Sequence, residues 1–234
     1  MQPNDPIKEQ LARFCDPAVA ARYADGPVRF VPGLADLHRM TAVLLAERAP
    51  PDASVLVLGA GGGLELKALA SAQPGWRFVG VDPAAAMLAE AKRTVGPDRH
   101  RITFCEGYID DAPAGPFDAA ACLLTLHFLE RDERVRTARE IRRRLKPGAP
   151  FVAAHSSIPG TESERATWVS RYAAFAIAAG ADPDHVNQGR ATIAASSRLF
   201  FGPEENAAVL REAGFTGVEM FYAAFTWRGW IAYA

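Results

Sequence analysis

The chain has 234 residues, of which 49% are hydrophobic and 23% are charged, and these values predict a globular protein and exclude a disordered one. Its formal net charge of −1 provides no overall attraction to nucleic acid or to an anionic membrane. No apolar stretch approaches the ~20 residues that a membrane-spanning helix requires, so no membrane partner is expected.

Residues 1–54 are predicted to form a helical segment that precedes the sheet. The N-terminus is polar and lacks the apolar core of a secretory signal. After an irregular piece, the stretch 34–50 has the spacing of an amphipathic helix. Its apolar side carries Leu37, Met40, Leu44 and Leu45. We expect this segment to act as a lid beside a ligand.

Strands and helices alternate from residue 55 to residue 157. Apolar runs typical of buried parallel strands cover 55–58, 76–82, 101–107, 117–126 and 150–156. Helical spacing covers 64–72, 83–96 and 131–146, with Pro83 at one helix start and Gly96 at its end. Repeated strand–helix units with short connections predict an α/β fold with a doubly wound, Rossmann-like sheet.

Residues 158–200 form a predicted helical insertion after the fifth strand. Thr161 and Glu164 have the spacing of a capping box, and Asp182 and Pro183 mark the start of a second helix. Three aromatic residues recur at helical spacing: Trp168, Tyr172 and Phe175. This stripe is expected to form core packing, a cap over the substrate or the interface of a homodimer.

Residues 201–234 are expected to complete the fold. A helix over 203–215 is followed by two aromatic-rich strands that form an antiparallel pair at the sheet edge. The prediction is a mostly parallel, seven-stranded sheet with an antiparallel edge strand, formed by residues 55–157 and 201–234.

The stretch VLVLGAGGGLELKALA places four glycines in five positions between the first strand and a helix. In a doubly wound sheet this turn lies at the ligand-binding edge, and Gly59, Gly61 and Gly63 allow a ligand to approach the backbone. A dinucleotide turn has G-x-G-x-x-G spacing, whereas Leu64 replaces the last glycine here. Glu65, in the first helical turn, would repel a pyrophosphate. The turn therefore favours a cationic nucleoside and disfavours a nicotinamide dehydrogenase.

Asp82 ends the second predicted strand, 19 positions after Gly63. An acid at this place accepts hydrogen bonds from ribose hydroxyls. Asp82 suits a nicotinamide cofactor and an adenosyl ligand equally. It therefore predicts that the ligand contains a ribose, but it does not discriminate between these two ligands.

Five segments resemble, in order and spacing, the motifs of class I S-adenosylmethionine-dependent methyltransferases: VLVLGAGGG, VGVDPAAAML, CEGYIDDAP, FDAAACLLTLHFL and LKPGAPFVAA. The resemblance covers roughly residues 50–156 and implies S-adenosyl-L-methionine as the cofactor. It implies that the cofactor's methionine part lies on the glycine turn, its ribose on Asp82 and its adenine near the third and fourth strands. The cofactor-binding residues expected on this basis are Gly59, Ala60, Gly61, Gly63, Asp82, Pro83, Met87, Tyr108, Ile109 and Leu124. Many relatives carry Asp in place of Tyr108, and Tyr is a poorer acceptor for the adenine amino group.

A narrower resemblance links this chain to carboxy-S-adenosylmethionine synthases, which act in tRNA wobble-uridine modification. It is carried by RFVPGLADLHRMTAVLLAER, LTLHFL and GFTGVEMFYAAFTWRGWIA. That branch usually has Tyr and Asn where this chain has Leu34 and Leu123. The polar residues expected at the site for the extra carboxylate are therefore absent. We expect ordinary methyl transfer to a small molecule. The alternatives are an enzyme like the carboxylating branch and a non-catalytic adenosyl-binding protein.

His127 and His155 lie near the carboxyl ends of predicted strands and are candidate general bases. Either could instead only form hydrogen bonds at the rim of the sheet, because methyl transfer often needs positioning alone. The remaining histidines are scattered without metal-ligand spacing, so no metal is expected.

The run Arg142-Arg143-Arg144 is interpreted as a solvated helix face, because acids accompany it in the same helix, and nucleic acid is not the expected partner. Three widely spaced cysteines indicate reduced thiols and a cytoplasmic protein: Cys15, Cys105 and Cys122.

Overall fold

The computed structural model describes residues 12–23, 25–158, 160–195 and 200–234. The strands are β1 (Ser54–Leu58), β2 (Arg77–Asp82), β3 (Ile102–Glu106), β4 (Ala119–Leu123), β5 (Pro150–Ser156), β6 (Thr216–Ala224) and β7 (Trp227–Tyr233). The α-helices are α2 (Pro17–Ala20), α3 (Asp25–Phe30), α4 (Leu34–Ala46), α5 (Leu64–Ala72), α6 (Ala85–Thr94), α7 (Arg131–Arg143), α8 (Glu162–Ala178), α9 (Pro183–Ala195) and α10 (Pro203–Glu212). Short 3-10 helices are η1 (Gly96–Arg101), η2 (Ile109–Asp111) and η3 (Leu126–Phe128).

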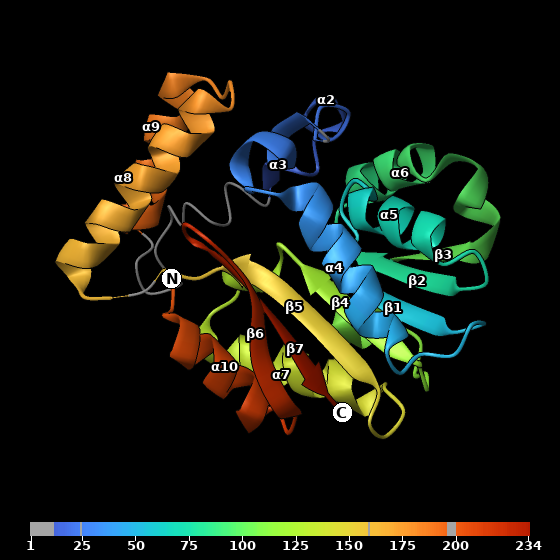
Figure 1. The fold of residues 1–234 in the computed structure, drawn as a ribbon. Coiled ribbons are helices and arrows are strands. Elements are labelled where there is room, and N and C mark those ends of the chain that lie inside the picture. The colour runs from blue at the N-terminus through green and yellow to red at the C-terminus, as the bar shows by residue number, and fades with distance from the viewer. Residues whose placement is uncertain (1–11, 24, 159, 196–199) are drawn as a thin grey trace.

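Within the described residues the strands form one sheet of seven, in the order β3-β2-β1-β4-β5-β7-β6 (Figure 1). β1 to β5 pair in parallel, whereas β7 is antiparallel to both of its neighbours. The strand order reverses between β1 and β4, so their carboxyl ends flank the crevice where doubly wound sheets bind ligands. The doubly wound, mostly parallel fold predicted from the sequence is confirmed.

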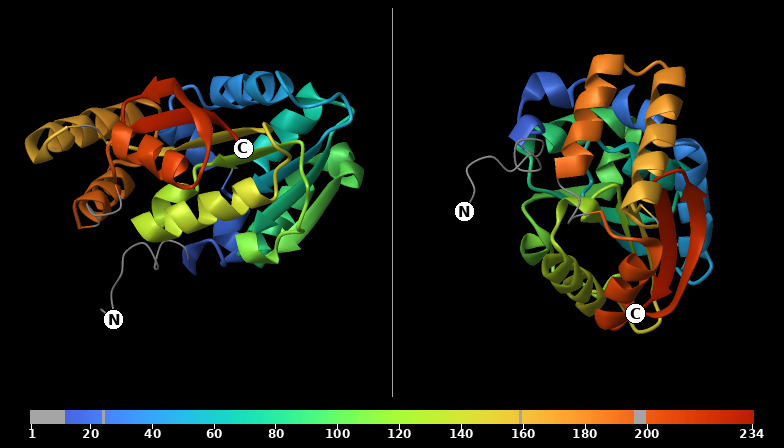
Figure 2. Two further views of the ribbon diagram at one scale, coloured as in Figure 1. Left: turned by 90° about the horizontal axis from the view of Figure 1, so that it is seen from below. Right: turned by 90° about the vertical axis from the view of Figure 1, so that its left-hand side faces the viewer.

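Helices cover both faces of the sheet (Figure 2). Apolar residues of α4, α5 and α6 pack on one face, and those of α7 and α10 pack on the other. In β1, Val55 and Val57 belong to the first cluster, while Leu56 and Leu58 belong to the second. Both sets are buried, which explains why this strand is apolar at consecutive positions rather than alternating with polar residues.

The fourth strand is shorter than predicted. It ends at Leu123 instead of continuing to residue 126, because Leu124 adopts a positive φ of 56°. The N–H group of Leu124 donates to the carbonyl of Ala154 (2.6 Å), and the chain then leaves the sheet through η3. The N-terminal piece predicted to be irregular also contains structure, namely the short helices α2 and α3.

The insertion after β5 forms a helical hairpin, α8 and α9, that extends away from the sheet (Figure 1). The expected capping box is present, since Glu164 Oε2 accepts the N–H of Thr161 (2.7 Å). Two aromatic residues of α8 contact the β6–β7 hairpin, with ring-centroid distances of 6.3 Å for Tyr172–Trp227 and 5.5 Å for Phe175–Phe225. These two aromatic residues therefore anchor the α8–α9 hairpin to the sheet.

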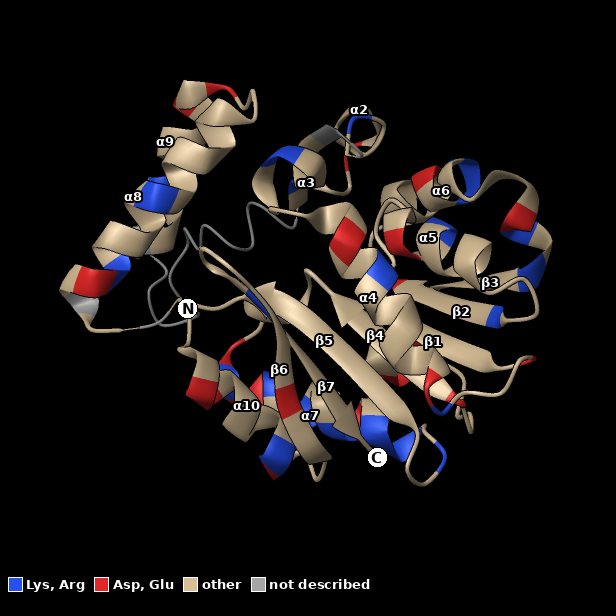
Figure 3. Ribbon diagram, in the orientation of Figure 1, with Lys and Arg blue, Asp and Glu red and all other residues tan. Residues whose placement is uncertain are grey.

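Charged residues lie mostly on helices and loops, and the strands carry few of them (Figure 3). Arg143 and Arg144 both pair with Glu140, one turn earlier on α7. Arg144 is only 3% exposed, so the arginine run does not form a continuous basic surface. Among the described helices, none combines the length and the apolarity needed to cross a membrane.

Replacing Gly63 with Ala should destabilise the fold by two separable effects. Gly63 has a φ of +82°, and an added Cβ would lie 2.8 Å from Cα of Ala91 on α6. Gly96 has a φ of +56° but no atom within 4 Å of an added Cβ. We expect Gly96→Ala to cost about 1–2 kcal/mol through the backbone alone. Gly63→Ala should cost about 1–3 kcal/mol more through overpacking, measured by urea unfolding. Equal losses in the two variants would contradict the close packing of α5 on α6.

Candidate functional site

The glycine turn follows β1 at the carboxyl edge of the sheet. The carbonyl of Val81, next to the end of β2, accepts the N–H groups of Gly59 (2.8 Å) and Ala60 (3.0 Å). Gly59 has a φ of +76°, and a Cβ there would lie 1.9 Å from Oγ1 of Thr125. The turn is thus held between β2 and the loop after β4, with no space for a side chain at Gly59.

Asp82, at the end of β2, links the glycine turn to the start of α6. Its carboxylate accepts the N–H of Gly61 through Oδ2 and the N–H of Ala84 through Oδ1, both at 2.9 Å. Burial raises the pKa of Asp82, and these two N–H groups oppose that rise. Each carboxylate oxygen can accept a further hydrogen bond, so the group can still bind ribose hydroxyls. The predicted ribose-binding acid therefore also positions the glycine turn.

Glu65 lies in the first turn of α5 and is 8% exposed. Burial, together with the charge of Asp82, raises its pKa to about 8, although its own backbone N–H stabilises the ionised form. At neutral pH the carboxyl group in this structure is therefore mostly protonated. The sequence indicated an acid at this position, and the structure places it in electrostatic contact with Asp82.

Tyr23 covers the glycine turn from the N-terminal segment. Its ring packs so closely on Gly62 that an added Cβ there would lie 2.6 Å from the ring. Burial, with the charges of Glu65 and Asp82, raises the pKa of the Tyr23 phenol. Phe14 makes edge contacts with Tyr23 (5.9 Å between ring centroids) and with Phe128 (6.3 Å). Sequence reasoning missed Tyr23, because its segment has no periodic pattern to indicate which side is buried.

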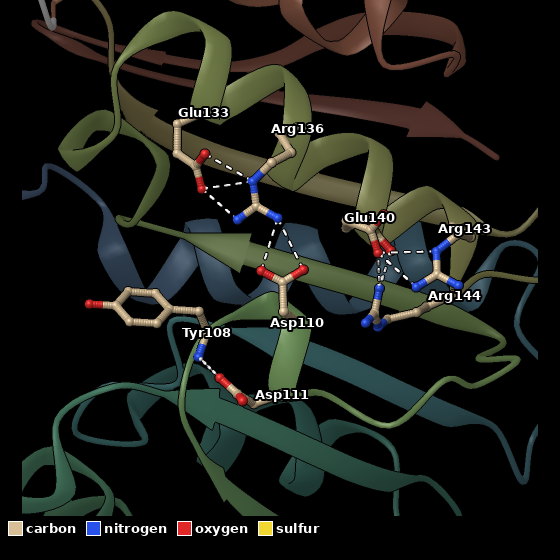
Figure 4. A network of polar contacts seen from close by, with 8 residues as sticks. All are labelled: Tyr108, Asp110, Asp111, Glu133, Arg136, Glu140, Arg143 and Arg144. Carbon is tan, nitrogen blue, oxygen red and sulfur yellow. Dashed lines mark hydrogen bonds and ion pairs between the residues drawn. The ribbon is translucent and has the colours of Figure 1, made fainter.

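The turn after β3 is fixed to α7 by the polar contacts drawn in Figure 4. Asp111 Oδ2 accepts the N–H of Tyr108 (2.9 Å), and the carboxylate of Asp110 accepts two hydrogen bonds from Arg136 (3.0 and 2.9 Å). Arg136 is also bound to Glu133. Tyr108 itself is 62% exposed, so its ring is available to a ligand at the rim.

The predicted cofactor residues occupy three positions at this edge. Around the glycine turn and the start of α6 lie Gly59, Ala60, Gly61, Gly63, Asp82 and Met87, with Met87 Cε 3.5 Å from the Cβ position of Gly61. Pro83 and Tyr108 are exposed at the rim, whereas Ile109 is buried in the apolar core. Leu124 follows β4 directly and is half-buried.

The two candidate histidines differ in their surroundings. His155 Nε2 donates to Oδ1 of Asn206 (3.0 Å), which also accepts a bond from Arg134 (2.8 Å), and burial lowers the pKa of His155 to about 3. The ring of His127 lies edge-on to Trp227 (5.6 Å). Burial, with the charges of His155 and Arg134, holds the pKa of His127 well below its ordinary value. Among the described residues, neither Nδ1 atom has a hydrogen-bond partner.

Glu65 should make the folded protein less stable as the pH rises from 6.5 to 8. Its carboxyl ionises near pH 4.5 when unfolded and near pH 8 when folded, so the folded state retains a proton that the unfolded state has lost. The free energy of unfolding should fall by up to about 1.4 kcal/mol per pH unit. The histidines whose pKa is lowered by folding reduce the stability of the protein only below about pH 6.5, which is outside this window.

Urea unfolding at several pH values measures this slope. Glu65→Gln should flatten it and raise stability at pH 8, whereas Glu47→Gln, at an exposed position of α4's end, should leave it unchanged. A slope retained in Glu65→Gln would contradict the assignment.

The chain is similar in sequence to a family model and to several curated proteins. A family model described as methyltransferase domain matches residues 55–148. Carboxy-S-adenosyl-L-methionine synthase of Campylobacter concisus is 26% identical over 230 residues, covering 98% of this chain and 96% of that protein. The Pseudomonas fluorescens enzyme of the same name is 27% identical over 212 residues, covering 87% of this chain and 85% of its own length.

Solved structures share the fold at low sequence identity. A methyltransferase described as S-adenosylmethionine-dependent, from Aquifex aeolicus, superposes with a TM-score of 0.62 at 16% identity, covering 93% of this chain and 98% of that one. Human N-acetylserotonin methyltransferase, solved with S-adenosylmethionine, gives 0.62 at 15% identity, and this chain spans 60% of its length. Residues 55–148 thus match a methyltransferase domain, and the chain as a whole shares the fold of solved S-adenosylmethionine-dependent methyltransferases.

Proposed function

We propose that this protein transfers the methyl group of S-adenosylmethionine to a small-molecule acceptor. The observation that carries the proposal is the buried glycine turn, which Asp82 ties to the end of β2 and which is followed by the buried carboxyl group of Glu65 in the first turn of α5. Adenosine would lie between Asp82 and the rim at Tyr108, with the sulfonium above the carboxyl end of β4. The acceptor would be held between the N-terminal segment and the α8–α9 hairpin.

Methyl transfer requires the acceptor atom to approach the sulfonium methyl in line, away from water. The aromatic residues Phe14, Tyr23 and Phe128 supply an apolar cover beside the turn. A base is needed only when the acceptor must lose a proton. His127 suits that role better than His155, whose Nε2 is already engaged by Asn206.

The low pKa of His127 bears on the class of acceptor. The ring is neutral at physiological pH and always has a lone pair available, but it is a weak base. A weak base matches an acceptor that gives up its proton more easily than an alcohol does, such as a phenol. We therefore propose O-methylation of an acidic hydroxyl group.

A second candidate is carboxylation of the cofactor, supported by relatives of that name that match nearly the whole chain. Two positions argue against it. Leu34 and Leu123, where that branch usually has Tyr and Asn, are 6% and 3% exposed and pack in the apolar core. Neither offers a polar group to an added carboxylate.

Calorimetric titration tests the ligand. We expect S-adenosylmethionine and S-adenosylhomocysteine to bind and NAD to bind far more weakly or not at all. Asp82→Ala should weaken S-adenosylmethionine roughly ten-fold or more, because a charged hydrogen-bond acceptor is lost. Asp118→Ala is the matched control, since Asp118 caps the opposite end of β1 by accepting the N–H of Ser54 (2.9 Å). Preference for NAD, or equal losses in both variants, would contradict the proposal.

Product mass analysis tests the reaction. Purified protein is incubated with methyl-labelled S-adenosylmethionine and a panel of phenols, carboxylic acids, amines and thiols. We expect label on a phenol, and a fall in kcat of roughly 100-fold or more in His127→Gln with unchanged cofactor affinity. A carboxylated cofactor would favour the second candidate. Binding without transfer to any acceptor would instead support a non-catalytic adenosyl-binding protein.

A further inference from the structure

Glu65 is a buried ionisable group that the proposed reaction does not use. Within the described residues, its carboxyl group has no hydrogen-bond donor other than its own backbone N–H. The ionisable groups that influence it or are influenced by it are all acidic: Asp82 at the end of β2, Tyr23 of the N-terminal segment and the Cys122 thiol of β4. A buried carboxyl with so few hydrogen-bond donors is destabilising, and a ligand that supplies a partner would relieve this.

The amino-acid end of the cofactor offers Glu65 two different partners. An ionised carboxylate would form an ion pair with the α-ammonium group, whereas a protonated carboxyl would donate a hydrogen bond to the ligand's carboxylate. The surrounding charge decides between them. An anion placed here would face Asp82 and Glu65 with no described cation acting on Glu65, but an ammonium group neutralises that charge.

We propose that Glu65 binds the α-ammonium group of the cofactor's methionine moiety. This inference rests on the proposed function, because it requires an adenosyl amino acid on the glycine turn. As the ligand enters, the proton of the Glu65 carboxyl passes to solvent and the resulting carboxylate pairs with the ammonium. Binding therefore releases a proton below about pH 8, and affinity rises with pH up to that value.

Two ligands that differ in the amino-acid moiety test the assignment by calorimetry. S-adenosylhomocysteine carries the ammonium group, whereas 5′-methylthioadenosine shares the adenosine and the thioether but has no amino acid. Glu65→Gln should weaken S-adenosylhomocysteine roughly ten- to a hundred-fold and leave 5′-methylthioadenosine unchanged. Asp82→Ala, as the matched control, should weaken both ligands, because both contain the ribose.

Proton release provides a second readout. Titrations of S-adenosylhomocysteine at pH 7 in buffers of different ionisation enthalpy should show close to one proton released by the native protein and none by Glu65→Gln. Thermal unfolding confirms that the variant is folded.

The alternatives give opposite results. Gln can still donate a hydrogen bond to a carboxylate, so retained S-adenosylhomocysteine affinity or proton uptake on binding would overturn the proposal. Equal weakening of the two ligands would also overturn it. If the native protein binds neither ligand, the proposed function itself is refuted instead.

Discussion

The site depends on the hydrogen bonds made at the end of β2. The Asp82 carboxylate holds Gly61 and Ala84, and its backbone carbonyl accepts the N–H of Gly107 (3.1 Å) after β3. One residue therefore positions the glycine turn, the start of α6 and the turn that carries Tyr108. A ligand that binds Asp82 contacts a residue whose orientation is already fixed, which reduces the entropy lost on binding.

Acidic groups are concentrated around the glycine turn. Glu65, Asp82 and Tyr23 are acidic groups in mutual electrostatic contact, and burying them together opposes ionisation. Such an arrangement lowers the stability of the empty protein. If Glu65 pairs with the ammonium group as proposed, the same feature that weakens the fold also contributes to ligand selection.

Much of this arrangement follows from local sequence patterns. Consecutive apolar residues identified β1 and β5, and the glycine spacing with Asp82 predicted the sheet edge at which a ligand would bind. Features that depend on distant segments could not be predicted. Tyr23 reaches Gly62 across nearly 40 positions of chain, and His155 meets Asn206 and Arg134 only once β5, α10 and α7 pack together. The early end of β4 depends on the positive φ of Leu124, for which a leucine gives no local signal.

A crystal structure with S-adenosylhomocysteine tests the central claim most directly. We expect the ribose hydroxyls within hydrogen-bond distance of Asp82 and the amino-acid end of the ligand on the glycine turn. A ligand bound elsewhere, or a ribose without contact to Asp82, would contradict it.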